Sequence, residues 1–348
     1  MVGIEIVEPA DIPVIDFQTL STGTPQKRKT ALKQLDDAFQ SVGLIHLSNH
    51  SIGQDLVDEA FAWFVTLTTP KTTVAGQLLV LPSQVKGFGI KKISSTYTKR
   101  ARWNGGKTSR QEIPTRVRFP ILTSSGIESC QKKYFPALKA FTKRWWDACV
   151  EQELQLLQYL CEILEIPDKD LLGKQQNPHF NRSATGWNHY LSVPAQYLTS
   201  GQSTRLNAHT DYGQLTLLFQ DTTGGLEVKD DEAGVFRPVL PRPGMAIVQV
   251  ADMLERQSNG RWKSALHRVT IPHHLKHSDP GDGTLIERYS IGFFIQPDFD
   301  LVIKPLPGCE AKGRWSSLEW EDEITAGEWL TRRVALEYQQ KGSSKSAA

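Results

Sequence analysis

The pattern of apolar and polar positions divides the chain into a helical first part, a β-rich middle and a helical end. Apolar residues recur at helical spacing over about 26–41 and again over about 53–66. The same spacing predicts a long helix over about 126–165, which Pro136 interrupts or starts, and a last helix over about 318–340. Helices are therefore expected on both sides of a central segment of different periodicity.

The middle of the chain, after Ser183, consists of short segments of β character separated by turn residues. These segments are Leu215–Gln220, Leu226–Lys229, Ala246–Val250, Leu266–Ile271 and Arg288–Ile295. Many short strands at this spacing favour a β-sandwich or jelly roll. Two more strands are expected near the start, at 12–17 and 43–47. We therefore predict a mainly β fold with flanking helices.

No linker separates these parts, so we predict a single domain over residues 1–340. Its parts are an N-terminal portion over about 1–125, the long helix over about 126–165, a jelly-roll core over about 183–300 and the C-terminal helix over about 318–340. Residues 341–348 are mostly serine and other small residues, and we expect them to form a disordered tail.

Composition and charge exclude several classes of protein. Of the 348 residues, 39% are apolar and 22% are charged, which is enough to fill a sizeable core. No run approaches about 18 consecutive apolar residues, and the start lacks a basic segment followed by an apolar one, so we expect neither a transmembrane helix nor a signal peptide. Four scattered cysteines predict no disulfide framework, and a net charge of +2 argues against nucleic acid as a partner. We expect a soluble, cytoplasmic protein that binds neither a membrane nor nucleic acid.

A potential metal site begins with the pair His209 and Asp211. Residues i and i+2 of a strand project to the same face, so the imidazole and the carboxylate would lie beside one point. A second histidine, His267, follows 58 residues later in another predicted strand. Two histidines and one carboxylate form the facial triad of non-haem Fe(II) enzymes, which leaves three coordination positions for chemistry.

Arg288, Ser290 and Phe294 share one face of a later predicted strand. A guanidinium beside a hydroxyl indicates a site for a carboxylate, because arginine binds carboxylates through two parallel hydrogen bonds. Taken singly, each signal has an ordinary alternative: a strand histidine is often only packed, and Arg288 could form a structural ion pair. Phe294 could stack on a flat substrate or only fill the barrel. The succession of H-x-D, a distant histidine and R-x-S is much more specific than any one of them.

With these motifs the sequence resembles the Fe(II)/2-oxoglutarate-dependent oxygenases of the isopenicillin N synthase-like superfamily. The resemblance covers nearly the whole chain and is carried by residues 12–17, 43–52, 209–228 and 258–269. Among the members, the chain looks most similar to small-molecule hydroxylases of the thymine-hydroxylase kind and to their relatives in fungal natural-product pathways.

The resemblance implies a double-stranded β-helix, which is a cupin-like jelly roll, with Fe(II) held by His209, Asp211 and His267. It implies 2-oxoglutarate as cosubstrate, with Arg288 and Ser290 on its distal carboxylate, and O2 as oxidant. Residues 188–190 fall where the family has N-Y-Y, so the resemblance adds two candidates for binding the cosubstrate. These are Tyr190 and, less strongly because the middle residue departs from the pattern, Asn188.

Two further departures from the family pattern accompany this assignment. Residues 273–283 lengthen the segment between His267 and Arg288, which bears on the register of the following strand. Ala251 stands before Asp252 where relatives usually have glycine, and we expect this change to be structural only.

The function that these features imply is oxidation of a small aromatic or heteroaromatic metabolite in natural-product biosynthesis. Hydroxylation is the first expectation, and desaturation or ring expansion could follow from the same centre. One alternative is an oxidase that works without 2-oxoglutarate and uses the R-x-S pair for its substrate's carboxylate. Another is a catalytically inactive small-molecule binding protein on the same barrel. The sequence indicates no oligomeric state.

The substrate side of the site is expected to involve Phe294, Tyr212 and Arg102. Arg102 lies in the segment 86–118, where ten basic residues stand against one acidic residue. A solvated basic loop is the favoured explanation of this segment. In the family the corresponding region borders the mouth of the active site, so a lid that attracts an anionic substrate is the alternative.

Five further histidines have spacings that could suit a metal. For His46 and His50, packing and stabilisation of a turn are favoured over metal binding. His273, His274 and His277 stand in a segment bounded by proline and glycine, which favours a solvated loop.

Overall fold

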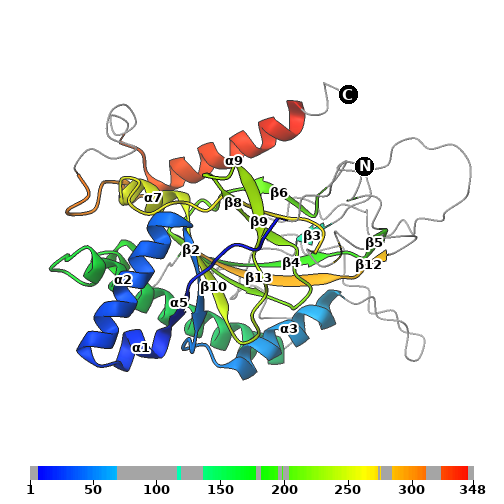
Figure 1. The fold of residues 1–348 in the computed structure, drawn as a ribbon, viewed down its shortest axis with the longest axis horizontal. Coiled ribbons are helices and arrows are strands. Elements are labelled where there is room, and N and C mark those ends of the chain that lie inside the picture. Colours follow the sequence, from blue (N-terminus) through cyan, green and yellow to red (C-terminus); the bar gives the residue numbers. More distant parts are fainter. Residues whose placement is uncertain are drawn as a thin grey trace, which may run out of the picture.

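Two β-sheets with helices on either side form the part of the chain that the computed structural model describes (Figure 1). This part comprises residues 7–68, 116–118, 136–177, 182–194, 198, 204–272, 275, 284–310 and 323–343. Within it, no helix is long and apolar enough to cross a membrane. The basic segment 86–118, expected to be a solvated loop or alternatively a lid, lies outside the described residues except for 116–118.

The larger sheet has the strand order β1-β2-β10-β7-β13-β4-β3. Its strands are β1 Val14–Asp16, β2 Leu44–Ser48, β3 Arg116–Arg118, β4 Ala184–Tyr190, β7 Leu215–Gln220, β10 Ala246–Val250 and β13 Arg288–Ile295. The smaller sheet, in the order β6-β11-β8-β9, contains β6 Leu206–His209, β8 Leu226–Asp230, β9 Val235–Pro238 and β11 His267–Val269. A short pair consists of β5 Val193–Pro194 and β12 Thr284–Leu285. The result is the predicted mainly β fold, with strands β7, β10 and β13 at the predicted bounds.

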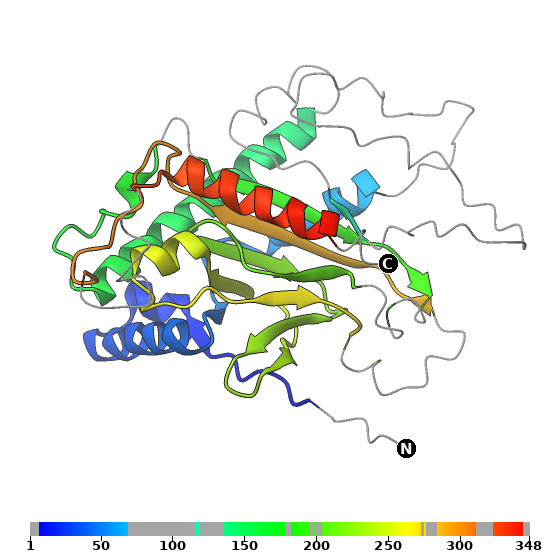
Figure 2. The ribbon, with the colours of Figure 1, turned by 90° about the horizontal axis from the view of Figure 1, so that it is seen from above.

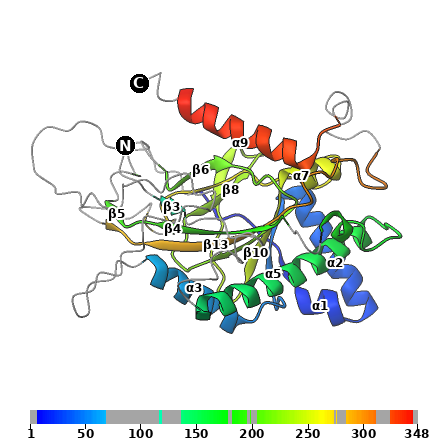
Figure 3. The same cartoon turned by 180° about the vertical axis from the view of Figure 1, so that it is seen from behind.

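The helices are α1 Phe17–Thr22, α2 Pro25–Ser41, α3 Gln54–Thr68, α5 Pro136–Ile163, α7 Asp252–Gln257 and α9 Ala326–Ser343, with a 3₁₀ turn, η1, at Gly173–Gln175. Seen from the front and from behind, α1, α2, α3 and α5 lie on one side of the strands and α9 lies on the other (Figures 1 and 3). Figure 2 shows α9 running along the direction of β13. The sheets therefore lie between two groups of helices.

Strand periodicity separates a helix-facing core from the space between the sheets. Alternate residues of β13, among them Ile291 and Phe293, join the large core cluster that includes residues of α5. From α5, Trp145 packs on Phe219 with ring centroids 5.2 Å apart, and its indole N–H donates to Thr185 Oγ1. The other residues of these strands must face the smaller sheet, so polar side chains at those positions are directed into the barrel.

The start of the last helix differs from the predicted bound. For the long helix, the described part of α5 covers Pro136–Ile163, and the predicted residues before Pro136 lie outside the described part. The last helix is predicted from about 318, but α9 begins at Ala326. There Thr325 Oγ1 accepts from the backbone N–H of Glu328, and Glu328 Oε2 accepts from that of Thr325. This capping box fixes the start of α9 more strongly than apolar spacing does.

The predicted disordered tail begins too early in the chain. Helix α9 continues to Ser343, so residues 341–343 are helical and not part of a disordered end. Residues 344–348 lie outside the described part.

The buried histidine His46 of β2 predicts a loss of stability in acid. Its side chain is 2% exposed, and it belongs to no group of three potential metal ligands among the described residues. Burial, with a smaller contribution from the nearby charge of Arg242, lowers the pKa of His46 from 6.5 to about 4. Between these values the unfolded chain binds the proton and the folded chain does not. Stability should therefore fall as pH drops from 6.5 toward 4, by at most about 3 kcal/mol from this residue.

The variant His46→Leu tests this expectation, because it removes the proton-binding group and keeps a buried side chain. Its free energy of unfolding, measured by denaturant titration, should decline less steeply than that of the wild type between pH 6.5 and 4. Parallel curves for the two proteins would mean that other groups cause the acid sensitivity.

Candidate active site

Three potential metal ligands meet where the smaller sheet adjoins the loop after β6. His209 ends β6 and His267 begins β11, and the register of these antiparallel strands places the two residues opposite each other. Asp211 follows β6 by two residues. His209 Nε2 lies 3.7 Å and His267 Nε2 lies 4.0 Å from Asp211 Oδ1. Three ligand atoms, one from each residue, lie within 4.8 Å of one another, so a single metal ion could bind all three.

Hydrogen bonds orient both imidazole rings for this purpose. His209 Nδ1 lies 2.9 Å from the carbonyl oxygen of Asn207, and His267 Nδ1 lies 2.8 Å from that of Ala265. A carbonyl oxygen can only accept, so Nδ1 of each neutral ring carries the hydrogen and donates it. The lone pair is left on Nε2, which faces Asp211. This is the usual arrangement of histidines that bind a metal.

The two oxygens of the Asp211 carboxylate have different partners. Its Oδ2 accepts hydrogen bonds from Thr216 Oγ1, at 2.7 Å, and from Gln249 Nε2. Oδ1 remains directed toward the two histidines. Burial alone would raise the pKa of Asp211, but electrostatic attraction to the His267 and His209 rings and these hydrogen bonds outweigh it, so the pKa lies below its ordinary value. The group is therefore ionised at neutral pH, as a metal ligand must be.

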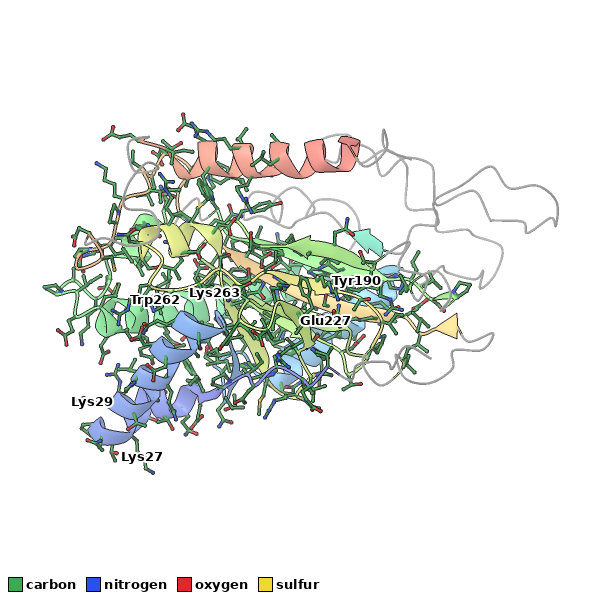
Figure 4. All side chains as sticks on the ribbon, turned by 45° about the horizontal axis from the view of Figure 1, so that its top comes forward. Lys27, Lys29, Tyr190, Glu227, Trp262 and Lys263 are labelled. Carbon is green, nitrogen blue, oxygen red and sulfur yellow. The ribbon has the colours of Figure 1, made fainter. Side chains whose placement is uncertain are left out.

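The residues predicted for a carboxylate site come together on adjacent strands. Along β13, Arg288 pairs with Tyr190 of β4, and Ser290 pairs with Asn188. The guanidinium of Arg288 lies over the ring of Tyr190, 4.7 Å from its centroid, and Tyr190 lies among the strands (Figure 4). The Nη2 atom of Arg288 donates a hydrogen bond to Gln220 Oε1 at 2.8 Å. The Nε and Nη1 atoms of this 1% exposed side chain have no hydrogen-bond partner among the described residues, so part of the guanidinium is available to an anion.

The predicted substrate residues have different surroundings. Phe294 pairs in register with Thr216, the residue that supports Asp211. Its ring lies back over Gly292, where an added Cβ would come within 3.0 Å of Phe294 Cζ, so glycine makes room for this ring position. Tyr212 directly follows Asp211, and Arg333 of α9 lies over its ring at 5.5 Å. Arg102 lies outside the described residues, as do His273, His274 and His277.

Sequence reasoning missed the contribution of α9. Arg333 Nη2 donates to Thr210 Oγ1 at 2.8 Å, and Arg333 Nε lies 2.8 Å from Asp252 Oδ2. The backbone N–H of Asp252 donates in turn to the carbonyl oxygen of Asp211. The C-terminal helix thereby braces the turn that carries Asp211. No local sequence signal indicates this contact, since Arg333 is far from both partners along the chain.

Gln249 was also missed as part of the site, and its contact predicts a measurable effect. The change Gln249→Leu removes one of the two donors to Asp211 Oδ2 and leaves that oxygen partly unsatisfied. Loss of such a supporting hydrogen bond typically weakens metal affinity by about 10–100-fold. Titration with Fe(II) under anaerobic conditions should show a loss in this range.

Gln257→Leu is the matched control for this change. Gln257 is also buried, but its hydrogen bonds go to Gln214 and Gln175 and not to a potential metal ligand. Equal losses of Fe(II) affinity in the two variants would contradict a specific role of Gln249.

Comparison with known proteins places the chain in a family. The sequence profile of the 2OG-Fe(II) oxygenase superfamily matches residues 181–297, and that of the N-terminal region of non-haem dioxygenases in morphine synthesis matches residues 12–67. The 2-oxoglutarate-dependent dioxygenase lolO2 of Epichloe uncinata is 41% identical over 349 residues, which cover 96% of either chain. The chain belongs to the 2OG-Fe(II) oxygenase superfamily. Proline hydroxylase buaE of Petromyces alliaceus is 30% identical, with 94% of this chain and all of buaE covered.

Solved structures agree on the fold of this 2OG-Fe(II) oxygenase. A full-length Neurospora crassa protein, solved in complex with alpha-KG, superposes with a TM-score of 0.71 at 22% identity, covering 95% of this chain and 99% of its own. A dioxygenase for auxin oxidation from Arabidopsis thaliana gives a TM-score of 0.61 at 20% identity and covers 84% of this chain and 96% of its own. The predicted jelly-roll core is confirmed. The predicted enzyme class is confirmed as well: the protein is a dioxygenase that uses Fe(II) and 2-oxoglutarate.

Proposed function

We propose that this dioxygenase hydroxylates a small aromatic or heteroaromatic metabolite in a natural-product pathway, with Fe(II) bound by His209, Asp211 and His267. The observation that carries the metal assignment is the cluster itself. Two oriented imidazoles and an ionised carboxylate bring three ligand atoms within 4.8 Å of one another. Two imidazoles and one carboxylate are a donor set that fits Fe(II), and these three residues would hold it. When bound, the iron supplies the oxidising chemistry, and the protein supplies placement.

We further propose that the chain's own residues hold the cosubstrate at its far carboxylate. Arg288 offers two nitrogens that have no partner in the described part of the chain, and Ser290 follows it on the same face of β13. Asn188 and Tyr190 are the paired residues on β4, so both can complete this end of the site. Gln220 and the ring of Tyr190 hold the guanidinium of Arg288 in place. Its remaining donors are therefore already positioned before the cosubstrate binds.

The substrate class rests on the two aromatic residues near the metal ligands. Phe294 and Tyr212 offer flat surfaces on which a ring can stack. Relatives with ring-shaped ligands support this proposal: one is named a proline hydroxylase, and the Neurospora crassa protein has been crystallised with thymine and with 5-formyluracil. We place the enzyme in the cytoplasm, since Cys149, Cys161 and Cys309 are all buried free thiols.

Anaerobic loading with Fe(II) and 2-oxoglutarate, followed by O2 and a panel of aromatic and heteroaromatic metabolites, tests this function. Succinate should form in an amount equal to that of a product that is heavier than the substrate by one oxygen atom. Products formed without succinate would favour an oxidase that does not use 2-oxoglutarate. Tight Fe(II) binding without turnover of any compound that binds would favour a binding protein.

A further inference from the structure

A second buried arginine lies beside the proposed site for the cosubstrate's carboxylate. Arg205 directly precedes β6 and is 2% exposed. Its Nη2 donates to the carbonyl oxygen of Ile286 at 2.6 Å. Its Nε and Nη1 are buried and have no hydrogen-bond partner within the described parts of the chain. A buried guanidinium with two free donor atoms is costly, because the lost hydration is not replaced.

Two strands bring Arg205 to the same end of the barrel as Arg288. It lies in the bend directly before β6, four residues ahead of His209, and its hydrogen bond to the backbone of Ile286 fixes its position. Ile286, which accepts its hydrogen bond, stands two residues before Arg288 at the start of β13. Burial, and then the nearby charge of Arg288, lower the pKa of Arg205 to about 10, which still leaves it charged at neutral pH.

The carboxylate of Asp221 forms no ion pair with either of these two cations. Asp221 is close enough to influence Arg205 electrostatically. Its carboxylate is occupied by backbone groups, however: Oδ1 accepts from the N–H of Thr223 at 2.9 Å, and Oδ2 accepts from that of Tyr289. Among the described residues, neither Arg205 nor Arg288 forms an ion pair with a carboxylate. The nitrogens of the two side chains that have no partner among the described residues are therefore available to an anion.

We propose that Arg205 is a second arginine for the distal carboxylate of 2-oxoglutarate, so that two guanidiniums hold this end of the cosubstrate. This inference rests on the proposed placement of 2-oxoglutarate at Arg288. The substrate is the less suitable occupant for a geometric reason. Phe294 and Thr216 lie toward the other end of β13, beside Asp211, whereas Arg205 is tied to the segment just before Arg288.

Binding of two oxo acids to Arg205 variants tests the inference without turnover. Wild type, Arg205→Leu and Arg205→Lys are loaded with Fe(II) under anaerobic conditions. They are then titrated with 2-oxoglutarate and with 2-oxobutyrate, which lacks the distal carboxylate, by calorimetry and by the charge-transfer absorption. Arg205→Leu should weaken 2-oxoglutarate binding by at least about tenfold, and Arg205→Lys should weaken it less. Binding of 2-oxobutyrate should be the same in all three proteins.

The matched control is Arg256→Leu, which removes another buried arginine that stacks on Trp329 outside the barrel. It should leave the affinity for both oxo acids unchanged. If Arg205→Leu does not fold, the lysine variant still decides, through a loss that is restricted to 2-oxoglutarate.

Three results would overturn the inference. Equal weakening of both oxo acids would show that Arg205 only maintains the structure. Unchanged affinity for 2-oxoglutarate would show that Arg205 does not reach it. An increase in the KM of the main substrate alone would assign Arg205 to that substrate. Failure of the proposed function looks different, because then wild-type protein itself would not bind 2-oxoglutarate in the presence of Fe(II).

Discussion

Replacing His209, Asp211 or His267 with alanine should abolish turnover and release bound Fe(II) while the protein stays folded. Each residue contributes one of the three ligand atoms that lie within 4.8 Å of one another. A change in a residue that only supports a ligand costs about 10–100-fold in metal affinity, so loss of a ligand itself should cost more. Iron content after desalting, the thermal unfolding midpoint and turnover measured on the same preparations separate a lost ligand from a lost fold.

The change Asp211→Glu extends this prediction to geometry. Glutamate keeps the charge, but its additional methylene displaces the carboxylate from Thr216 and Gln249 and from the point that the histidines face. We expect it to fail almost as completely as alanine. His46→Leu is the control, since it removes a buried histidine that belongs to no ligand cluster in the described structure. Near-full iron content and activity in His267→Ala would make the assignment of the three ligands wrong.

Local spacing was sufficient to predict that Arg288 and Ser290 share one face of β13, because strand periodicity alone gives that face. The spacing also selected the pair His209 and Asp211, but Asp211 lies beyond the end of β6, so its position depends on the following turn and not on strand periodicity. The longer segment before Arg288 did not disturb the register, because Arg288 still pairs with Tyr190 and Ser290 with Asn188.

Contacts between distant elements could not be predicted in this way. Gln249 reaches Asp211 only because β10 lies beside β7 in the larger sheet, and Arg333 reaches Thr210 only because α9 lies against the turn after β6. Arg205 shows the same limit: as a single arginine before a strand it resembles many surface residues. Its hydrogen bond goes to the backbone of Ile286, which is 81 positions away.

Arg288→Leu should weaken binding of 2-oxoglutarate strongly and leave Fe(II) binding intact. The change removes the guanidinium that Gln220 and Tyr190 hold in place, and it leaves the cosubstrate's carboxylate facing a leucine in a buried site. Truncating one partner of a buried charged pair costs about 2–5 kcal/mol, which corresponds to roughly 30-fold to several thousand-fold in affinity. Anaerobic titration of the Fe(II)-loaded variant with 2-oxoglutarate measures the loss directly.

Milder variants of the same site give this prediction its internal control. Ser290→Ala and Tyr190→Phe each remove one hydroxyl and keep the guanidinium, so their losses should be smaller than that of Arg288→Leu. The result for Arg288→Leu also depends on Arg205. If two arginines hold the carboxylate, the variant keeps some preference for 2-oxoglutarate over 2-oxobutyrate, and only the double change Arg205→Leu with Arg288→Leu removes that preference. Unchanged affinity for 2-oxoglutarate in Arg288→Leu, together with weaker binding of the main substrate, would instead place the substrate's own carboxylate at Arg288.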